Sequence, residues 1–91
     1  MRHDQAETLA IQALSWLASD EDNLSQFLNV TGAAPGDLRA RAVEPEFLGF
    51  VLDFIMRDDK TILGFCNAAS ATPESVQRAR VELGGGLPNW T

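Results

Sequence analysis

Carboxylates are the most concentrated reactive groups in this chain of 91 residues, and they gather at two places. Asp20 to Asp22 form one cluster, and Asp58 with Asp59 form the other. A calcium-binding loop needs a glycine at its sixth position and a glutamate at its twelfth. Counted from Asp20, Leu24 takes the fifth position and no glycine follows it at the sixth, so such a loop does not fit. Acidic residues at a helix start accept hydrogen bonds from free backbone N–H groups. We therefore predict two helix caps and no metal site.

Nucleophiles and bases are too few for a recognisable catalytic arrangement. His3 is the single histidine and lies near the beginning of the chain, where we expect a frayed end. Cys66 is the single cysteine, so it forms no internal disulfide, and its inward helical position predicts a buried thiol. The glycines at 84–86 follow a predicted helix without a phosphate-binding lysine, which indicates a helix end. We predict that the protein is not an enzyme and needs no cofactor.

Basic residues on two equivalent segments are the feature that most favours nucleic-acid binding. These segments carry Arg39, Arg41, Arg78 and Arg80. However, 13 acidic residues outnumber 7 basic ones, and the formal net charge is −6. The arginines are also shifted by one position between the two segments, which turns their side chains about 100° apart around the helix axes. We interpret them as ordinary helix surface and expect neither nucleic acid nor a membrane surface as the partner.

The second half of the chain repeats the first half at an offset of 38 residues, without gaps. The identical pairs are Leu14 and Leu52, Asp20 and Asp58, Phe27 and Phe65, Asn29 and Asn67, Ala33 and Ala71, Pro35 and Pro73, Val43 and Val81, and Glu44 and Glu82. We expect one domain over residues 1–91, with repeat one at about 6–43, repeat two at about 44–83 and a tail at 84–91. The two repeats must pack against each other, because helical arrays need about three units to bury a continuous core.

Proline, glycine and acidic caps divide the chain into six apolar-periodic segments, and none alternates with the period of a strand. The predicted helices begin at about Asp4, after Asp20, at Pro35, at Pro45, after Asp58 and at Pro73. The first ends near Ser19, the second at Gly32 and the third near Ala42. We predict an all-α fold, a compact six-helix bundle made of two tandem three-helix repeats with pseudo-two-fold symmetry. The first and fourth helices, which are the longest and most apolar, should form its centre.

The two repeats differ most in the bulk of their apolar residues. Phe50 stands where the first repeat has Gln12, and Leu63 stands where it has Ser25. Two explanations are open: a lopsided core with the fourth helix central and the first peripheral, or an exposed apolar patch that marks a protein interface. Trp90 in the tail is an independent candidate, which either folds back onto the domain or anchors a partner. Phe50, Leu63 and Trp90 are therefore the candidate partner surface.

Several short motifs, spread over nearly the whole chain, resemble those of a known family. They are WLASD, QFL followed by TG, DLR and LDFIMRDD. With these motifs the chain resembles the domain-of-unknown-function 3572 family of small bacterial proteins. The resemblance implies a small helical cytoplasmic protein, and it supplies no catalytic or binding residue.

The sequence favours a cytoplasmic protein that works by interaction with another protein. The apolar runs stay well below the roughly 18 residues that a membrane span needs, and the acidic start lacks the features of a secretory signal. A single thiol fits a reducing compartment. The leading hypothesis is a non-enzymatic protein-protein interaction or adaptor module, with a homodimer as one form of it. A small nucleic-acid-associated regulator and an unrecognised small-ligand binder are the alternatives.

Overall fold

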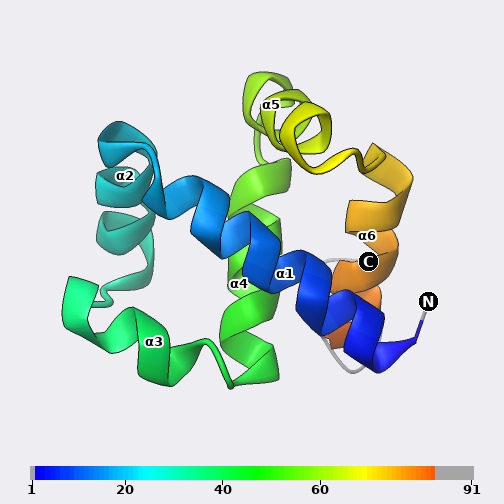
Figure 1. Cartoon of the computed structure of the whole chain (residues 1–91). Coiled ribbons are helices and arrows are strands. Elements are labelled where there is room, and N and C mark those ends of the chain that lie inside the picture. The colour runs from blue at the N-terminus through cyan, green and yellow to red at the C-terminus, as the bar shows by residue number, and fades with distance from the viewer. Residues whose placement is uncertain (1, 84–91) are drawn as a thin grey trace.

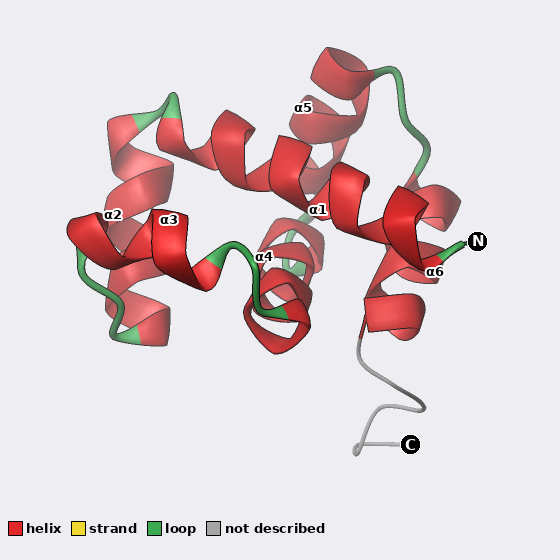
Figure 2. Ribbon diagram, turned by 60° about the horizontal axis from the view of Figure 1, so that its bottom comes forward, coloured by secondary structure: helices red, strands yellow, loops and turns green. Residues whose placement is uncertain are grey.

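Six α-helices joined by short connections make up the described part of the chain, residues 2–83 of a computed structural model (Figure 1). They are α1 (His3–Ala18), α2 (Glu21–Thr31), α3 (Leu38–Arg41), α4 (Pro45–Met56), α5 (Asp59–Ala69) and α6 (Pro73–Leu83). A 3-10 turn at Pro35–Asp37 leads into α3. Between residues 2 and 83 every regular element is a helix, as Figure 2 shows. The all-α prediction with six helices is confirmed.

Side-chain caps fix where the second helix of each repeat begins. The Asp20 carboxylate accepts hydrogen bonds from the backbone N–H groups of Asp22, at 2.9 Å, and Asn23, at 3.2 Å. The Asp58 carboxylate accepts one from the backbone N–H of Thr61 at 2.7 Å. Gly32 ends α2 with a φ of 73°, a left-handed conformation that glycine adopts without steric cost. The predicted capping role of both acidic clusters is therefore confirmed.

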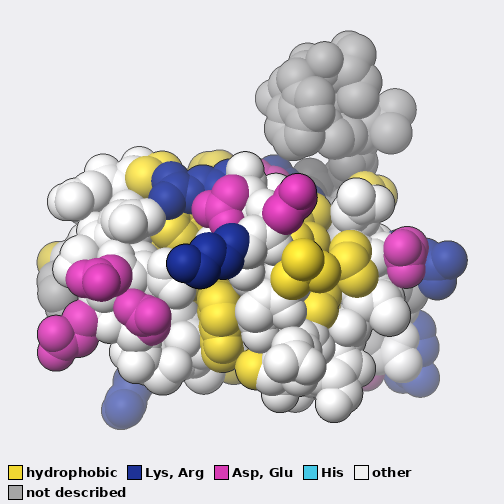
Figure 3. Space-filling model, turned by 90° about the horizontal axis from the view of Figure 1, so that it is seen from above, with side chains coloured by type: hydrophobic (Ala, Val, Ile, Leu, Met, Phe, Trp, Pro, Cys, Tyr) yellow, Lys and Arg dark blue, Asp and Glu magenta, His cyan; other side chains and the backbone are white. Residues whose placement is uncertain are grey.

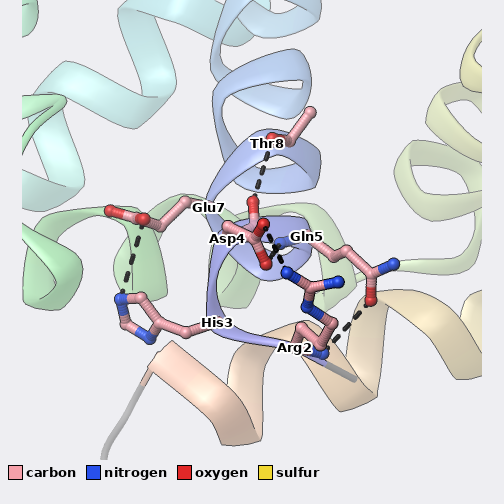
Figure 4. Close-up of polar contacts among 6 residues, drawn as sticks. All are labelled: Arg2, His3, Asp4, Gln5, Glu7 and Thr8. Atoms are coloured by element: carbon pink, nitrogen blue, oxygen red, sulfur yellow. Dashed lines mark hydrogen bonds and ion pairs between the residues drawn. The ribbon is translucent and has the colours of Figure 1, made fainter.

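The first turn of α1 is held by local polar contacts (Figure 4). The Thr8 hydroxyl donates to the Asp4 carbonyl at 2.9 Å, and the Arg2 backbone N–H donates to Gln5 Oε1 at 3.2 Å. His3 Nε2 lies 3.8 Å from Glu7 Oε1, and its Nδ1 lies 4.0 Å from a Glu82 carboxylate oxygen on α6. His3 is thus the first residue of the helix and contacts a second helix, where the sequence suggested a frayed end.

Small residues allow α1 to approach its neighbours closely. Ala6, Ala10 and Ala13 are fully buried, and α1 packs against both α4 and α6. Larger buried residues of α4 fill the space beside it: Phe47, Leu48, Val51, Leu52, Phe54 and Ile55. The centre of the fold therefore consists of α1, α4 and α6. The first helix is central and not peripheral, so its small residues reflect close helix packing, and the lopsided-core explanation in that form is wrong.

The third helix of each repeat differs in length and packing. α6 has 11 residues and lies against α1 and α4, whereas α3 has 4 residues and its main contacts are with the preceding 3-10 turn. Pro45 disfavours a helical conformation of Glu44, which is extended with φ −92° and ψ 117°, so α3 ends before it. Gly36 stands where α6 has Glu74, and glycine lowers helix propensity. The predicted pseudo-two-fold symmetry of the bundle is therefore not confirmed.

One aromatic pair does recur between the repeats. Trp16 on α1 packs edge-to-face against Phe65 on α5, with ring centroids 5.9 Å apart. Phe54 on α4 packs in the same way against Phe27 on α2, at 5.4 Å. Trp16 and Phe54 are equivalent at the 38-residue offset, as are Phe27 and Phe65. Each repeat thus contributes the second helix that covers the first helix of the other.

Candidate functional site

A groove of about 510 Å³ lies between α2 and α4 and is bordered by α3. We call it the α2–α4 groove. Its lining residues are Phe27, Val30 and Thr31 of α2, Arg41 of α3, and Phe50, Asp53, Phe54 and Arg57 of α4. On both α2 and α4 these residues lie three or four positions apart, which places them along one face of each helix. In Figure 1 the two helices run upright, with α2 at the left and α4 in the centre, and α1 crosses α4 and ends beside α2.

The floor of the groove is aromatic and its walls are apolar. Phe27 is fully buried and contacts the rings of Phe47, at 5.7 Å, and Phe54, at 5.4 Å, both edge-to-face. Phe50 and Val30 stand on the walls with exposed fractions of 46% and 66%. The floor therefore belongs to the core, whereas the walls present apolar surface to solvent.

Two arginines lie toward the two ends of this apolar surface. The Arg41 guanidinium lies over the Phe47 ring, 5.3 Å from its centroid, and the Arg57 guanidinium lies over the Phe54 ring at 4.2 Å. Phe47 and Phe54 are seven residues apart on α4, which corresponds to two helical turns. Arg57 also donates a hydrogen bond of 2.5 Å to Gln26 Oε1, a neutral acceptor. Both guanidinium groups therefore rest on aromatic faces at the groove, and Arg57 Nε also lies 4.0 Å from an Asp58 carboxylate oxygen.

The carboxylate in the groove is already paired. Asp53 accepts a hydrogen bond from Arg80 Nε on α6 at 2.7 Å, and the two side chains are 36% and 21% exposed. The Arg80 guanidinium also lies over Gly49, where an added Cβ would approach its Nη1 to 3.0 Å. Of the four arginines that the sequence singled out, Arg80 thus joins α6 to α4, and Arg41 borders the groove.

Phe50 and Leu63, two members of the predicted partner surface, are both exposed. Leu63 on α5 has an exposed fraction of 59% and does not line the α2–α4 groove, whereas Phe50 does. Trp90 lies outside the described residues. Figure 3 likewise shows exposed hydrophobic side chains in separate clusters among charged ones, seen from above. Within residues 2–83, Phe50 is therefore the member of the predicted surface that lines this groove.

Of the eight residues that line the groove, the sequence singled out only Phe50 as a partner contact. Val30, Arg41 and Arg57 are among those that it did not identify as groove residues. A signal for one of them was present, since Phe50, Phe54 and Arg57 share one face of α4 by spacing alone. The contribution of α2 and α3 had no such signal, because it depends on how the helices pack.

Two titratable groups are shifted by their surroundings, and neither lies in the groove. Hydrogen bonding from the Thr61 backbone and side chain lowers the pKa of Asp58, as expected for a cap carboxylate. Burial, with a smaller effect of Glu74, raises the pKa of the Cys66 thiol. Cys66 is buried as predicted. Across residues 2–83 no cluster of three or more histidine, cysteine or acidic side chains is arranged to hold a metal ion.

Comparison with known proteins gives one result. The model of a family described as "Protein of unknown function (DUF3572)" matches residues 3–86 of the chain. Neither the curated proteins nor the solved structures contain a match. In addition, none of the helices described between residues 2 and 83 is long and apolar enough to cross a membrane.

Proposed function

We propose that this chain, which belongs to the DUF3572 family of proteins of unknown function, is a non-enzymatic module that binds another protein through the α2–α4 groove. The observation that carries the proposal is the pair of apolar walls, Phe50 and Val30, on either side of a preformed aromatic floor. Apolar grooves lined at helical spacing are a common way for helical domains to recognise protein segments.

The internal repeat supports a functional origin for the exposed apolar residues. The position equivalent to Phe50 in the first repeat is Gln12, and both side chains are exposed. The position equivalent to Val30 is Ala68, which is likewise exposed. Packing within the domain therefore does not account for the bulk of Phe50 and Val30, whereas contact with a partner does.

Other interpretations take a second place. A cytoplasmic location and a duplication that produced the two repeats both agree with the sequence. A nucleic-acid-associated role has less support, because Arg80 is engaged with Asp53 and the net charge is −6. A small-ligand role has some support from the groove volume, which lies within the range of ligand pockets, about 300 to 1,000 Å³.

The test of the proposal is whether binding requires Phe50, which forms one wall of the groove. The full chain and its Phe50→Ser variant are compared in cross-linking and co-purification from the cells that produce the protein, with Leu63→Ser as the control for loss of an exposed apolar residue elsewhere. We expect the same protein to be recovered with the wild type and Leu63→Ser and to be depleted with Phe50→Ser. Equal recovery by all three would exclude the groove as the binding site.

A further inference from the structure

We infer that the occupant of the α2–α4 groove is an amphipathic α-helix of a partner protein, with acidic residues about two turns apart and apolar residues between them. This inference rests on the proposed function and adds the chemistry of the partner. Its basis is the order of charges and apolar surface along α4: Arg41 beside Phe47, then Phe50, then Arg57 beside Phe54.

The form of the groove favours a helix over a small molecule. Pockets for small molecules bury about 70–90% of their ligand. The walls here stand open, since Val30 and Phe50 are 66% and 46% exposed. Two helices that lie beside each other and present rows of side chains at positions three and four apart form the kind of surface into which a third helix packs its own apolar row.

The charges at the groove favour an acidic partner. Asp53 is neutralised by Arg80 at 2.7 Å. Asp58 lies 4.0 Å from Arg57 Nε and stays ionised while it caps α5, so it offsets part of the Arg57 charge. Arg41, Arg57 and Arg80 against Asp53 and Asp58 still leave one net positive charge at the groove, on a chain of net charge −6. Complementary charges on a partner would steer it to this face, and an acidic helix would be repelled by the rest of the surface.

The spacing of the two arginines sets the spacing of the acids. Arg41 and Arg57 rest on Phe47 and Phe54, and seven residues of α-helix correspond to about 10.5 Å along the axis. A partner helix that runs along α4 would therefore carry Asp or Glu at positions i and i+7. Its apolar residues would stand at i+3 and i+4, where they meet Phe50 and Val30.

Selection from random peptides tests this pattern although the partner is unidentified. The full chain is immobilised, peptides long enough for about four helical turns are selected from a displayed library, and binders that are retained by Phe50→Ser are removed. We expect enrichment of acids at i and i+7 around an apolar pair. An enriched peptide should bind about tenfold more weakly after its two acids are changed to lysine, or when the chain carries Arg41→Glu. Arg39→Glu, a charge reversal on the same short helix outside the groove, is the matched control.

The outcomes separate the two proposals. No enrichment that depends on Phe50 would overturn the groove itself as a protein-binding site. Enrichment that depends on Phe50 but shows no acidic pair, or is insensitive to Arg41→Glu, would keep the proposed function and overturn the inferred chemistry. A concentration-dependent dimer of the wild type that is lost in Phe50→Ser, seen by sedimentation, would assign the groove to a second copy. Binding that appears only after removal of residues 84–91 would assign it to the chain's own tail.

Discussion

Replacement of Gly49 by alanine should change the stability of the protein by an amount that depends on Arg80. Gly49 lies inside α4, where alanine is favoured over glycine by about 1 kcal/mol. The new Cβ would lie 3.0 Å from Arg80 Nη1, closer than the two atoms normally approach. The Arg80 side chain must therefore move, although its hydrogen bond to Asp53 holds it in place.

The size of the effect of Gly49→Ala depends on how much stability the Arg80–Asp53 ion pair loses when the Arg80 side chain moves. At 2.7 Å, and with side chains 21% and 36% exposed, the Arg80–Asp53 pair lies between a surface ion pair, about 0 to 1 kcal/mol, and a buried charged hydrogen bond, about 1.5 to 3 kcal/mol. A loss of about 1 to 2 kcal/mol would cancel or exceed the gain in helix propensity. We therefore expect Gly49→Ala in the wild type to be neutral or destabilising by about 1 kcal/mol.

The sign should reverse when Arg80 is absent. In an Arg80→Ala background nothing opposes the new methyl group, and Gly49→Ala should stabilise the protein by about 1 kcal/mol. The difference between the two backgrounds corresponds to a shift in midpoint temperature of about 4 to 8 °C per kcal/mol for a domain of this size. Thermal and urea unfolding, followed by far-ultraviolet circular dichroism, measure both quantities.

Arg78→Ala provides the matched background, because Arg78 is exposed on the same helix. There, Gly49→Ala should behave as it does in the wild type. An equal effect of Gly49→Ala in all three backgrounds would refute the packing of Arg80 over Gly49, and with it the account of how α6 is fixed to α4.

Two further predictions concern the groove floor and the cap of α5. Phe27→Ala should lower the free energy of unfolding by about 3 to 5 kcal/mol in urea unfolding, because it removes a fully buried ring. Val30→Ala on the exposed wall should change the same quantity by no more than about 0.5 kcal/mol. Similar losses for the two variants would contradict the division into floor and wall. The pKa of Asp58 is lowered below 3.8 by the hydrogen bonds from Thr61, so its contribution to stability is present above that pH and is lost as the pH falls through the lowered value. Asp58→Asn keeps a capping side chain but does not titrate, so its urea midpoint should fall less steeply than that of the wild type below pH 3.8, and parallel curves would contradict the assignment.

The elements of the fold were predictable from the sequence because their signals are local. The caps at Asp20 and Asp58 and the helix end at Gly32 act within a few residues, and each lies where the sequence placed it. The shortness of α3 was readable in principle from Pro45, which forces Glu44 out of the helical region, and from Gly36. These two residues are the local difference between the third helices of the two repeats.

The site was less predictable because it depends on contacts between helices. Phe50 was identified as an unusual residue by comparison with Gln12, a difference that needs no structure. Its exposure, and its pairing with Val30 across a groove, depend on the packing of α2 beside α4. The position of Arg41 depends on α3, the helix for which the repeat gave the poorest guidance.

The comparison of the two aromatic pairs indicates why this groove lies where it does. On one side of the bundle the indole of Trp16 covers Gly64, so closely that a Cβ there would lie 3.1 Å from the ring. On the other side the equivalent residues are the smaller Phe54 and the polar Gln26.

The Trp16 indole thus fills the space beside Gly64 on α5. The corresponding space beside Gln26 on α2 is bordered by the Arg57 guanidinium, which lies over Phe54 and donates a hydrogen bond to Gln26. Arg57 itself stands where the first repeat has Ser19. The same aromatic contact therefore supports the core in both halves, and the residues around it differ at the positions of Trp16, Ser19 and Gly64. If duplication supplied the scaffold, these positions, together with those of Gln12 and Ala68, are where the two copies diverged around the proposed partner surface.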